Sequence, residues 1–288
     1  MRALGLGGAA SVAGCADRTE ASGSGPDSLT LATATTAYDS GLLNVLNREY
    51  ADRFGAEVEA VVRGTGASLR TARDGDCDAV LVHARPLEDE FLREGYGINR
   101  RRVMVNDFLI VGPPDDPAGV AGEDPVSAFR AIAEAEATFL SRGDRSGTHV
   151  RELRIWDEAG VDPGGGWYLE TGQGMGDTLT TAQQSGAYTL VDRGTFLAVG
   201  GDGALTRHVD FGIDDPPPLL RNEYAVIPVN PARRDVAYAL AMSYVGYLTG
   251  PGQAEIEEFR VAGERAFRPL ARSADPAFDQ YVPSDWPE

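Results

Sequence analysis

Apolar residues along the chain follow two spacings in turn, one typical of strands and the other typical of helices. Residues 29–36 form a short β-rich stretch, and apolar positions within 42–54 then recur every three or four residues up to Gly55. Such spacings place apolar side chains on one face of a helix, and a glycine after the last of them is a common helix stop. The pattern therefore predicts a strand followed by an amphipathic helix.

The alternation of strand and helix continues to about residue 248. Further strands are predicted at 57–62, 77–83, 103–111, 138–140, 167–170, 187–191 and 224–229. Further helices are predicted after Gly66, at 86–94 and 125–137, from the 146–148 turn to Gly160, and at 177–184 and 235–248. Strands that alternate with helices indicate α/β units and a largely parallel sheet.

Two proline-rich breaks divide these elements into two sets. One break is the Gly-Pro-Pro run at 112–114, and the other includes the three prolines at 216–218. The chain would therefore cross twice between two lobes. We predict an α/β fold of two lobes, each a mostly parallel sheet flanked by helices, with lobe 1 formed by 29–110 and 223–288 and lobe 2 by 111–222. In sheets of this kind, ligands bind at the carboxyl ends of the strands.

The composition fits a globular protein and excludes several other classes. Hydrophobic residues make up 42% of the 288 residues and charged residues 24%, which are ordinary values for folded domains. No apolar run reaches the ~18–20 residues that span a bilayer. The formal charge is −18, and all 26 Lys and Arg positions are arginine. Acidity without a basic stripe argues against nucleic-acid binding. Acidity without lysine suggests a high-salt host, although GC-rich codon usage also favours arginine.

The two cysteines cannot form a disulfide framework, and each has its own interpretation. Cys15 follows Val-Ala-Gly and a weakly hydrophobic stretch, which resembles a lipobox, where cleavage leaves the cysteine to be lipidated. Residues 16–28 are rich in Ser, Gly, Asp and Glu, as expected of a flexible tether. We therefore predict a lipoprotein signal and linker over 1–28, the alternative being a chance cysteine in a flexible N-terminus. Cys77 lies in a predicted strand and is expected to be a buried thiol.

Four predicted strand-to-helix turns carry hydroxyl groups and glycines. They lie at 33–41, 64–68, 142–148 and 172–178. A helix start has unsatisfied N–H groups and a partial positive charge, so it can bind an anion. Helix capping alone also explains Ser, Thr and Gly at such a turn. Four turns at the same end of two sheets nevertheless favour an anion site.

The 142–148 turn is the most specific of the four. Arg142 can donate two N–H bonds to an oxyanion, whereas Gly147 lets the backbone approach it closely. Ser146 and Thr148 add hydroxyl donors, and Asp144 could orient an arginine or accept a proton from a protonated oxyanion. The pattern Arg-x-Asp-x-Ser-Gly-Thr resembles the anion loop of phosphate receptors of ABC transporters. The alternative is a surface Arg–Asp pair beside a capping serine, which contributes ~0–1 kcal/mol.

A longer series of motifs resembles the tungstate-binding receptors of ABC transporters. These motifs run in order over roughly residues 30–231. They include Thr-Thr-Ala-Tyr-Asp-Ser-Gly at 35–41, Gly-Thr-Gly at 64–66, Asp-Gly-Asp-Cys-Asp-Ala-Val-Leu-Val-His at 74–83, the 141–149 turn, Gly-Gln-Gly-Met-Gly at 172–176, Asp-Arg-Gly-Thr at 192–195 and Val-Asn-Pro at 229–231. The resemblance implies a two-lobed, type II periplasmic-binding-protein fold that closes on an oxyanion.

The resemblance also implies which residues bind the anion. The first Thr/Ser-rich turn of the family falls on Thr35 and Thr36, the second on Thr65, and the anion-binding arginine on Arg142. The argument from helix starts adds Ser146, Gly147 and Thr148. The first turn departs from the family's Thr-Thr-Thr-Ser-Thr, since alanine stands at 34 and 37 and threonine at 36. These changes concern fine selectivity rather than anion binding.

Tungstate is the ligand that the resemblance favours. It is fully ionised at neutral pH, so a site for it should present donors, with each nearby acceptor engaged elsewhere. Molybdate has nearly the same size and charge, and the 142–148 turn by itself leaves phosphate open. The resemblance further implies a monomeric receptor without cofactor or metal. It would be lipid-anchored at the outer face of the cell membrane and deliver its ligand to a permease and an ATPase.

Two other classes of function compete with this interpretation. A hydrolase or transferase could use Ser146 with His149, but these residues lie three apart at a helix start, and no acid is evident to orient the histidine. The sequence contains no Walker loop, no GxSxG motif and no His/Cys/Asp cluster with metal-ligand spacing. A ligand-sensing domain of a regulator would need a DNA-binding helix pair, which the pattern does not contain.

Overall fold

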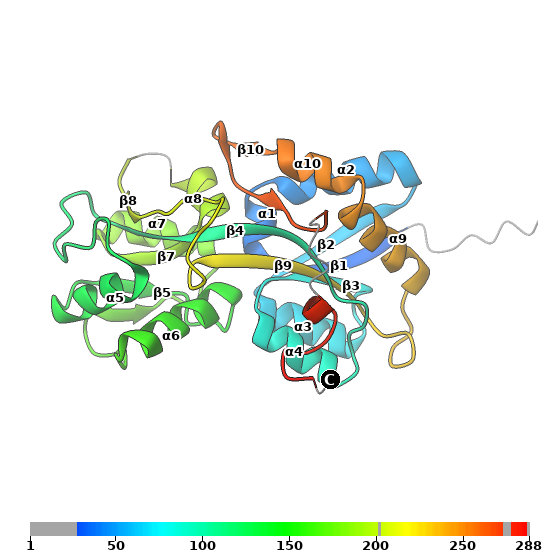
Figure 1. Ribbon diagram of the computed structural model, residues 1–288, viewed down its shortest axis with the longest axis horizontal. Helices are drawn as coiled ribbons and strands as arrows, with labels where there is room; N and C mark the ends of the chain where they lie inside the picture. The colour runs from blue at the N-terminus through cyan, green and yellow to red at the C-terminus, as the bar shows by residue number, and fades with distance from the viewer. Residues whose placement is uncertain (1–27, 201–202, 273–277, 287–288) are drawn as a thin grey trace, which may run out of the picture.

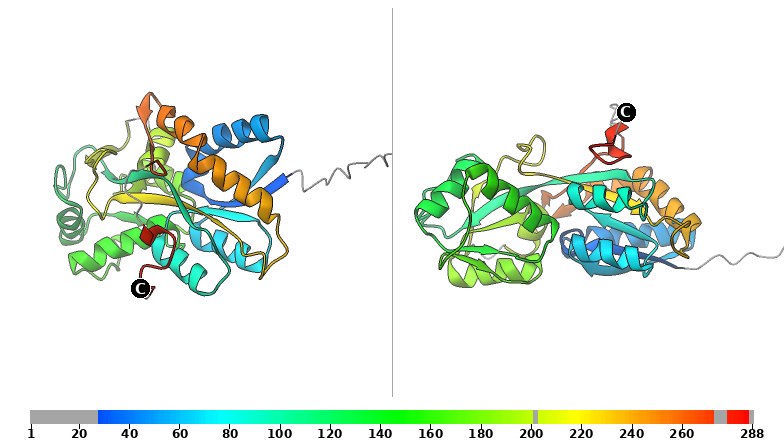
Figure 2. Two further views of the ribbon diagram at one scale, coloured as in Figure 1. Left: turned by 45° about the vertical axis from the view of Figure 1, so that its right-hand side comes forward. Right: turned by 90° about the horizontal axis from the view of Figure 1, so that it is seen from below.

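The protein consists of two α/β lobes joined by two long strands (Figure 1). The computed structural model describes residues 28–200, 203–272 and 278–286. Strands β4 (Arg101–Gly112) and β9 (Arg221–Pro228) run from one lobe into the other, which agrees with the two crossings of the predicted fold. Seen from below, the lobes lie side by side beneath these strands (Figure 2).

Lobe 1 is built from both ends of the described chain. Before the first crossing it contains β1 (Ser28–Ala34), α1 (Thr35–Asp39), α2 (Leu42–Phe54), β2 (Glu57–Arg63), α3 (Thr65–Asp74), β3 (Ala79–Val82) and α4 (Arg85–Arg93). After the second crossing it contains α9 (Tyr238–Thr249), α10 (Gly252–Glu258), β10 (Arg260–Val261), β11 (Glu264–Arg265), β12 (Arg268–Pro269) and the 3-10 helix η1 (Phe278–Gln280).

Lobe 2 is formed by the chain between the two crossings. Its elements are α5 (Pro125–Glu134), β5 (Phe139–Ser141), α6 (Gly147–Ala159), β6 (Tyr168–Glu170), α7 (Met175–Ser185), β7 (Thr189–Asp192), α8 (Arg193–Val199) and β8 (Thr206–Val209). Helices α6 and α7 follow β5 and β6 directly, so both helices begin at the carboxyl ends of strands.

The central sheet is mixed rather than mostly parallel. Its strand order is β12-β4-β9-β3-β1-β2, and β7 and β8 pair with the second half of β4. β1 is parallel to β2 and β3, and β5 is parallel to β6, whereas β4 and β9 pair antiparallel with all their neighbours. The parallel arrangement therefore holds for strands joined by a helix. Strands β4 and β9 each run between the two lobes. No βαβ connection joins them to the strands they pair with, so nothing requires them to be parallel to those strands.

Both lobes bury apolar side chains on the two faces of their strands. In lobe 1, Tyr50 and Tyr244 pack edge to face, with ring centroids 5.0 Å apart. In lobe 2, Trp156 is fully buried against Phe129, with ring centroids 4.3 Å apart, and Trp167 packs against the same cluster. These aromatic side chains bury large apolar areas, and they hold α2, α5, α6 and α9 against their sheets.

Most predicted elements are present, and the differences concern element ends and short elements. Helix α2 ends at Gly55, whose φ of 72° lies in the left-handed region, as the pattern predicts. The strand predicted at 29–36 instead ends at Ala34, because the next residues turn into α1 and bury Thr36. The pattern does not predict α8, which begins directly after β7.

Cys77 is a buried free thiol, as predicted, and burial raises its pKa to about 12.

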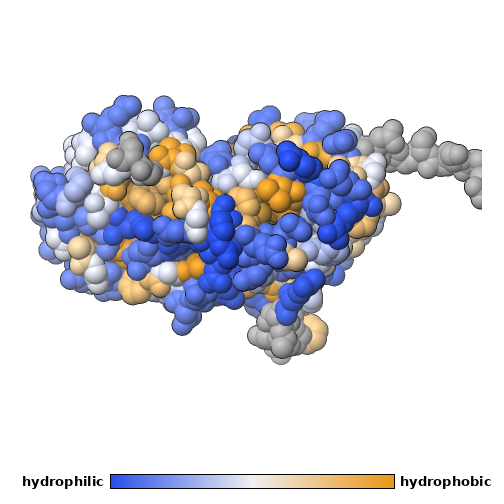
Figure 3. Space-filling view, turned by 90° about the horizontal axis from the view of Figure 1, so that it is seen from above, coloured by the Kyte–Doolittle hydropathy of each residue, from blue (hydrophilic) through white to orange (hydrophobic). Residues whose placement is uncertain are grey.

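Apolar residues are unevenly distributed over the described chain (Figure 3). Among the described helices, none combines the length and the apolar character needed to cross a bilayer. Hydrophilic residues dominate the face seen from above, and hydrophobic residues on it gather mainly where the two lobes adjoin (Figure 3).

Cys15 and most of the predicted signal and linker lie outside the described residues.

Candidate functional site

Four helix starts meet where the two lobes face each other. The guanidinium of Arg142 in lobe 2 donates through Nη1 to Oγ1 of Thr35 at the start of α1 in lobe 1, at 3.3 Å. A Cβ atom placed on Gly64, just before α3, would lie 3.4 Å from Oδ2 of Asp144. Arg142 also donates through Nε to the carbonyl of Gln173 before α7, at 3.2 Å. The structure thus brings all four predicted turns to one place between the lobes.

Arg142 is the buried charge at the centre of this arrangement. It is 3% exposed and forms an ion pair with Oδ2 of Asp144 at 2.7 Å. The other carboxylate oxygen of Asp144 accepts the N–H of Ser146 at 2.9 Å. The pair is therefore not an exposed surface pair, and both oxygens of its carboxylate already have donors. This arrangement is expected at an anion site, because carboxylate oxygens that already accept hydrogen bonds do not point at the bound anion.

Three buried hydroxyl groups at these helix starts have no hydrogen-bond partner among the described residues. They belong to Thr65 and Ser68 in the first turns of α3 and to Thr148 in the first turn of α6. Thr65 and Ser68 are 0% exposed and Thr148 is 1% exposed. A buried hydroxyl without a partner costs about 1–3 kcal/mol. Such groups are rare in folded proteins unless a ligand or water satisfies them, so these three are free to donate to an anion.

Two other predicted hydroxyls already have protein partners. Oγ of Ser146 caps α6 by accepting the N–H of His149 at 3.2 Å. Oγ1 of Thr36 lies 2.6 Å from the hydroxyl of Tyr224 and 3.4 Å from Nε2 of His83. These two residues therefore hold the helix starts in place. Their hydroxyls bond within the described part of the protein, whereas those of Thr65 and Thr148 do not.

The two lobes approach each other so closely at position 147 that only glycine fits there. A Cβ atom on this residue would lie 2.6 Å from Nδ1 of His83, which follows β3 in lobe 1. Any larger residue would push the start of α6 away from lobe 1. The backbone at Gly147 therefore sets how closely the lobes can come together.

A buried polar network behind these helix starts was not found by sequence reasoning. Nδ1 of His83 lies 2.8 Å from Oδ1 of Asn222, whose side-chain amide donates to Oδ1 of Asn106 at 2.6 Å. Asn106 donates in turn to Oδ1 of Asp192 at 3.2 Å. Burial lowers the pKa of His83 to about 4, so the ring is neutral near pH 7. The only sequence signal is the placement of asparagines in two apolar strands, where polar residues need a partner.

Asp39 places a carboxyl group at the edge of the site. It lines a cavity of about 420 Å³ between α1 and α7 together with Thr35, Gly176 and Asp177. Asp39 is exposed as a residue, but partial burial of its carboxyl group, followed by the nearby charge of Asp192, raises its pKa to about 6. Its carboxyl group therefore changes charge close to neutral pH, beside Arg142.

The residues of the enzyme alternative do not face each other as a nucleophile and its base. Ser146 Oγ accepts the backbone N–H of His149, and the His149 ring accepts the backbone N–H of Arg145 at 3.0 Å. Within the described residues, no group of three or more His, Cys, Asp or Glu is placed to hold a metal ion.

Two α/β lobes joined by two crossing strands, with helix starts from both lobes meeting between them, define the class of periplasmic solute-binding proteins. Residues 18–251 match the sequence model of the PBP superfamily domain, and the chain belongs to this family.

Relatives within the family are similar over most of the chain. A candidate ABC transporter anion-binding protein of Haloferax volcanii is 50% identical over 305 residues, covering 99% of this chain and 89% of that protein. The tungstate-binding protein TupA of Peptoclostridium acidaminophilum is 42% identical over 241 residues, covering 82% of this chain and 81% of that protein. The solved structure of the tungstate ABC transporter from Geobacter sulfurreducens matches with a TM-score of 0.74 and 44% identity, covering 81% of this chain and 98% of that one. These matches confirm the family and the fold that the sequence motifs predict.

Proposed function

We propose that this protein is an extracytoplasmic receptor of an ABC transporter that captures tungstate between its two lobes and delivers it for uptake. The observation that carries the proposal is the buried guanidinium of Arg142 between the lobes, together with the unpartnered hydroxyls of Thr65 and Thr148 at two of the helix starts that meet there. The names of the relatives from Peptoclostridium and Geobacter support tungstate as the ligand.

The chemistry of the site favours an anion that accepts hydrogen bonds and offers none. Arg142 supplies a positive charge, and the hydroxyls of Thr35, Thr65 and Thr148 supply donors. Each hydrogen bond to a charged partner contributes about 1.5–3 kcal/mol. Asp144, which could accept the proton of a monoprotonated phosphate, already accepts from Arg142 and Ser146. Tungstate therefore suits the donors better than phosphate does.

The remaining predicted residues take positioning roles in this proposal. Ser146 caps α6 and so directs its free N–H groups, Gly147 allows the lobes to close, and Thr36 holds the start of α1 against Tyr224. Lobe 1 comprises 29–110 and 223–288, and lobe 2 comprises 111–222. Closure of these lobes traps the anion, which then passes to a permease and its ATPase.

Molybdate is the second ligand that the same donors fit, because it has nearly the size and charge of tungstate. Calorimetric titration with tungstate, molybdate, sulfate and phosphate tests the proposal. We expect tight binding of tungstate, comparable or weaker binding of molybdate, and little heat with sulfate or phosphate. Heat with phosphate alone would contradict the ligand assignment, and burst kinetics on an ester would point to an enzyme instead.

Cys15 is proposed to anchor a monomeric receptor at the outer face of the cell membrane through a lipid. Residues 16–28 would then serve as the tether between the anchor and the folded lobes. Replacing Cys15 by serine should release the protein from the membrane fraction without changing its affinity for tungstate. Fractionation and mass spectrometry of the N-terminal peptide measure this, and a Cys15→Ser variant that stays membrane-bound would refute the anchor.

A further inference from the structure

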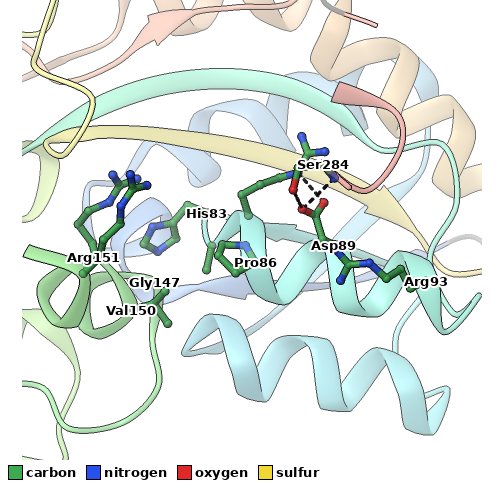
Figure 4. Close-up of a pocket in the computed structure, with 11 residues that line it drawn as sticks. His83, Pro86, Asp89, Arg93, Gly147, Val150, Arg151 and Ser284 are labelled. Carbon is green, nitrogen blue, oxygen red and sulfur yellow. Dashed lines mark hydrogen bonds and ion pairs between the residues drawn. The ribbon is translucent and has the colours of Figure 1, made fainter. Parts of the chain in front are cut away.

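A second cavity, apart from the proposed tungstate site, lies between α4 of lobe 1 and α6 of lobe 2. Its volume is about 390 Å³, within the ~300–1,000 Å³ typical of small-molecule sites. Figure 4 shows Arg151 and Gly147 from α6 on one side, Pro86 and Asp89 from α4 on the other, and His83 between them. An adjoining cavity of about 310 Å³ shares part of this lining.

The lining carries a marked excess of positive charge. Both cavities are lined by Arg85 of lobe 1, Arg151 and Arg154 of lobe 2, and Ser284 of the C-terminal segment. Arg93, which pairs with Asp285, adds a further guanidinium to the first cavity, and Asp89 is the only carboxylate among its described lining residues. The chain as a whole has a formal charge of −18, so the positive charge of this lining contrasts with the rest of the protein.

Arg151 is the least compensated of these arginines. It donates to the carbonyls of Pro218 and Arg221, at 2.8 and 2.9 Å, and its guanidinium lies over the ring of Phe108. Among the described residues, it forms no ion pair with a carboxylate. Burial and the nearby charge of Arg154 lower its pKa to about 10. Arg151 is half-buried, and a partly desolvated guanidinium without a counter-charge is costly, so an anion entering the cavity would be stabilised there.

The other arginines have capacity to share an anion. Arg154 uses Nε for Glu158 on its own helix, at 3.1 Å, and its side chain is 62% exposed. Arg85 pairs through Nε with Asp89 at 2.6 Å, and Asp89 also accepts from the N–H of Ser284 at 3.1 Å. Guanidinium groups form paired hydrogen bonds with carboxylates, and groups on two facing helices suit a ligand with more than one of them.

We propose that this cavity is a second anion site, which binds a small di- or tricarboxylate and joins lobe 1 to lobe 2. The ligand would contact Arg151 and Arg154 on α6 and Arg85 on α4, so it can be fully bound only when the lobes are closed. Gly147 and His83 line this cavity and also lie so close together between the lobes that no Cβ atom fits at Gly147. Binding at the two sites is therefore coupled, and each ligand should tighten the binding of the other by the same factor.

Calorimetric titration of the full chain with tricarballylate tests the second site. This tricarboxylate lacks the hydroxyl with which citrate chelates tungstate. Ionic strength is held constant with sodium chloride, and the titration is made with and without saturating tungstate, which fills the first site. We expect one equivalent of tricarballylate to bind in both cases, several-fold more tightly with tungstate present. Inorganic phosphate serves as the competing anion.

Two variants and one control locate the binding. Arg154→Gln changes an exposed side chain and should weaken tricarballylate binding about tenfold, and Arg151→Gln should weaken it at least as much. Arg130→Gln removes an exposed arginine of the same lobe outside both cavities and should bind as the unmodified protein does. Thermal unfolding checks that each variant is folded.

Three outcomes would overturn the inference. They are no tricarballylate binding, binding in the Arg154→Gln and Arg151→Gln variants as tight as in the unmodified protein, and binding of phosphate in preference to the carboxylate. The titration without tungstate makes the result independent of the proposed function. If tungstate itself fails to bind, the transport proposal fails, whereas loss of tricarballylate binding in Arg154→Gln would still support the second site.

Discussion

Arg142 is buried, and a bound anion could take the place of its hydrogen-bond partners or bind beside them. Its Nη1 bonds Thr35 across the lobes, and its Nη2 bonds Asp144 within the same loop. The first bond reaches lobe 1, so the same guanidinium takes part in closing the lobes. At the scale of single residues, this side chain is the one whose loss should matter most for oxyanion binding.

Replacing Arg142 by alanine should weaken tungstate binding by at least ~2 kcal/mol, or about thirtyfold, because a buried charge-assisted partner is lost. Calorimetry measures the change in Kd. Arg130→Ala is the matched control on the surface of the same lobe, and its affinity should be unchanged. Normal tungstate binding by Arg142→Ala would remove Arg142 from the site.

Asp39 should make tungstate binding depend on pH. Its pKa is raised to about 6, so the carboxyl group is charged above that pH and neutral below it. A dianion nearby disfavours the charged form, so binding takes up a proton and affinity should rise as the pH falls from 8 to 5. In Asp39→Asn this dependence should disappear, and affinity at pH 8 should increase roughly three- to tenfold. Titrations across this range measure both effects, and an unchanged pH profile in the variant would contradict them.

At the scale of elements, the first turns of α3 and α6 are unusual because they bury hydroxyls that bond nothing within the described protein. Thr65→Val and Thr148→Val keep the shape of the side chain and remove an unsatisfied polar group. Stability without ligand should therefore stay the same or rise by up to about 1 kcal/mol. Tungstate affinity should fall at least fivefold in each variant.

Thr178→Val in α7 is the matched control for these two variants. The hydroxyl of Thr178 lies 2.9 Å from that of Thr171, so its removal breaks a bond within the protein and should lower stability. Denaturant unfolding and calorimetry together separate the two kinds of threonine. If Thr65→Val and Thr148→Val lose stability but keep their affinity, these hydroxyls do not bind the anion.

Local sequence signals predicted the elements that carry the site, but not all of the pairing between them. The helices α2, α3, α6 and α7 follow glycine- or hydroxyl-rich turns, and those turns are readable from a few adjacent residues. The antiparallel pairing of β4 and β9 is not readable in this way, because residues more than a hundred positions apart decide it, such as Asn106 and Asn222. Helix α1 was missed for a similar reason, since Thr36 is buried against Tyr224 and Thr35 bonds Arg142 of lobe 2.

At the scale of the whole molecule, closure depends on the fit between Gly147 of lobe 2 and His83 of lobe 1. Gly147→Ala would place a methyl group against the His83 ring and hold the lobes apart. We expect at least tenfold weaker tungstate binding and a larger radius of gyration in the presence of tungstate, measured by small-angle X-ray scattering.

Gly164→Ala provides the control for that variant. Nothing lies within 4 Å of a Cβ atom at Gly164, so this methyl group should change neither affinity nor compactness. Full compaction of Gly147→Ala with unchanged Kd would show that the contact with His83 does not limit closure.

Hydrophobic spacing and turn signals in the sequence alone indicated the two-lobed α/β class and an anion site, because these are short-range features. The family followed from the resemblance of its motifs. Only the tertiary structure decided which hydroxyls are free. Thr36 meets Tyr224, 188 positions away, and its hydroxyl is engaged, whereas those of Thr65 and Thr148 are buried without a partner. The arginine-lined cavity depends on tertiary structure in the same way, because Arg85 and Arg151 belong to different lobes and share one space only once the chain has folded.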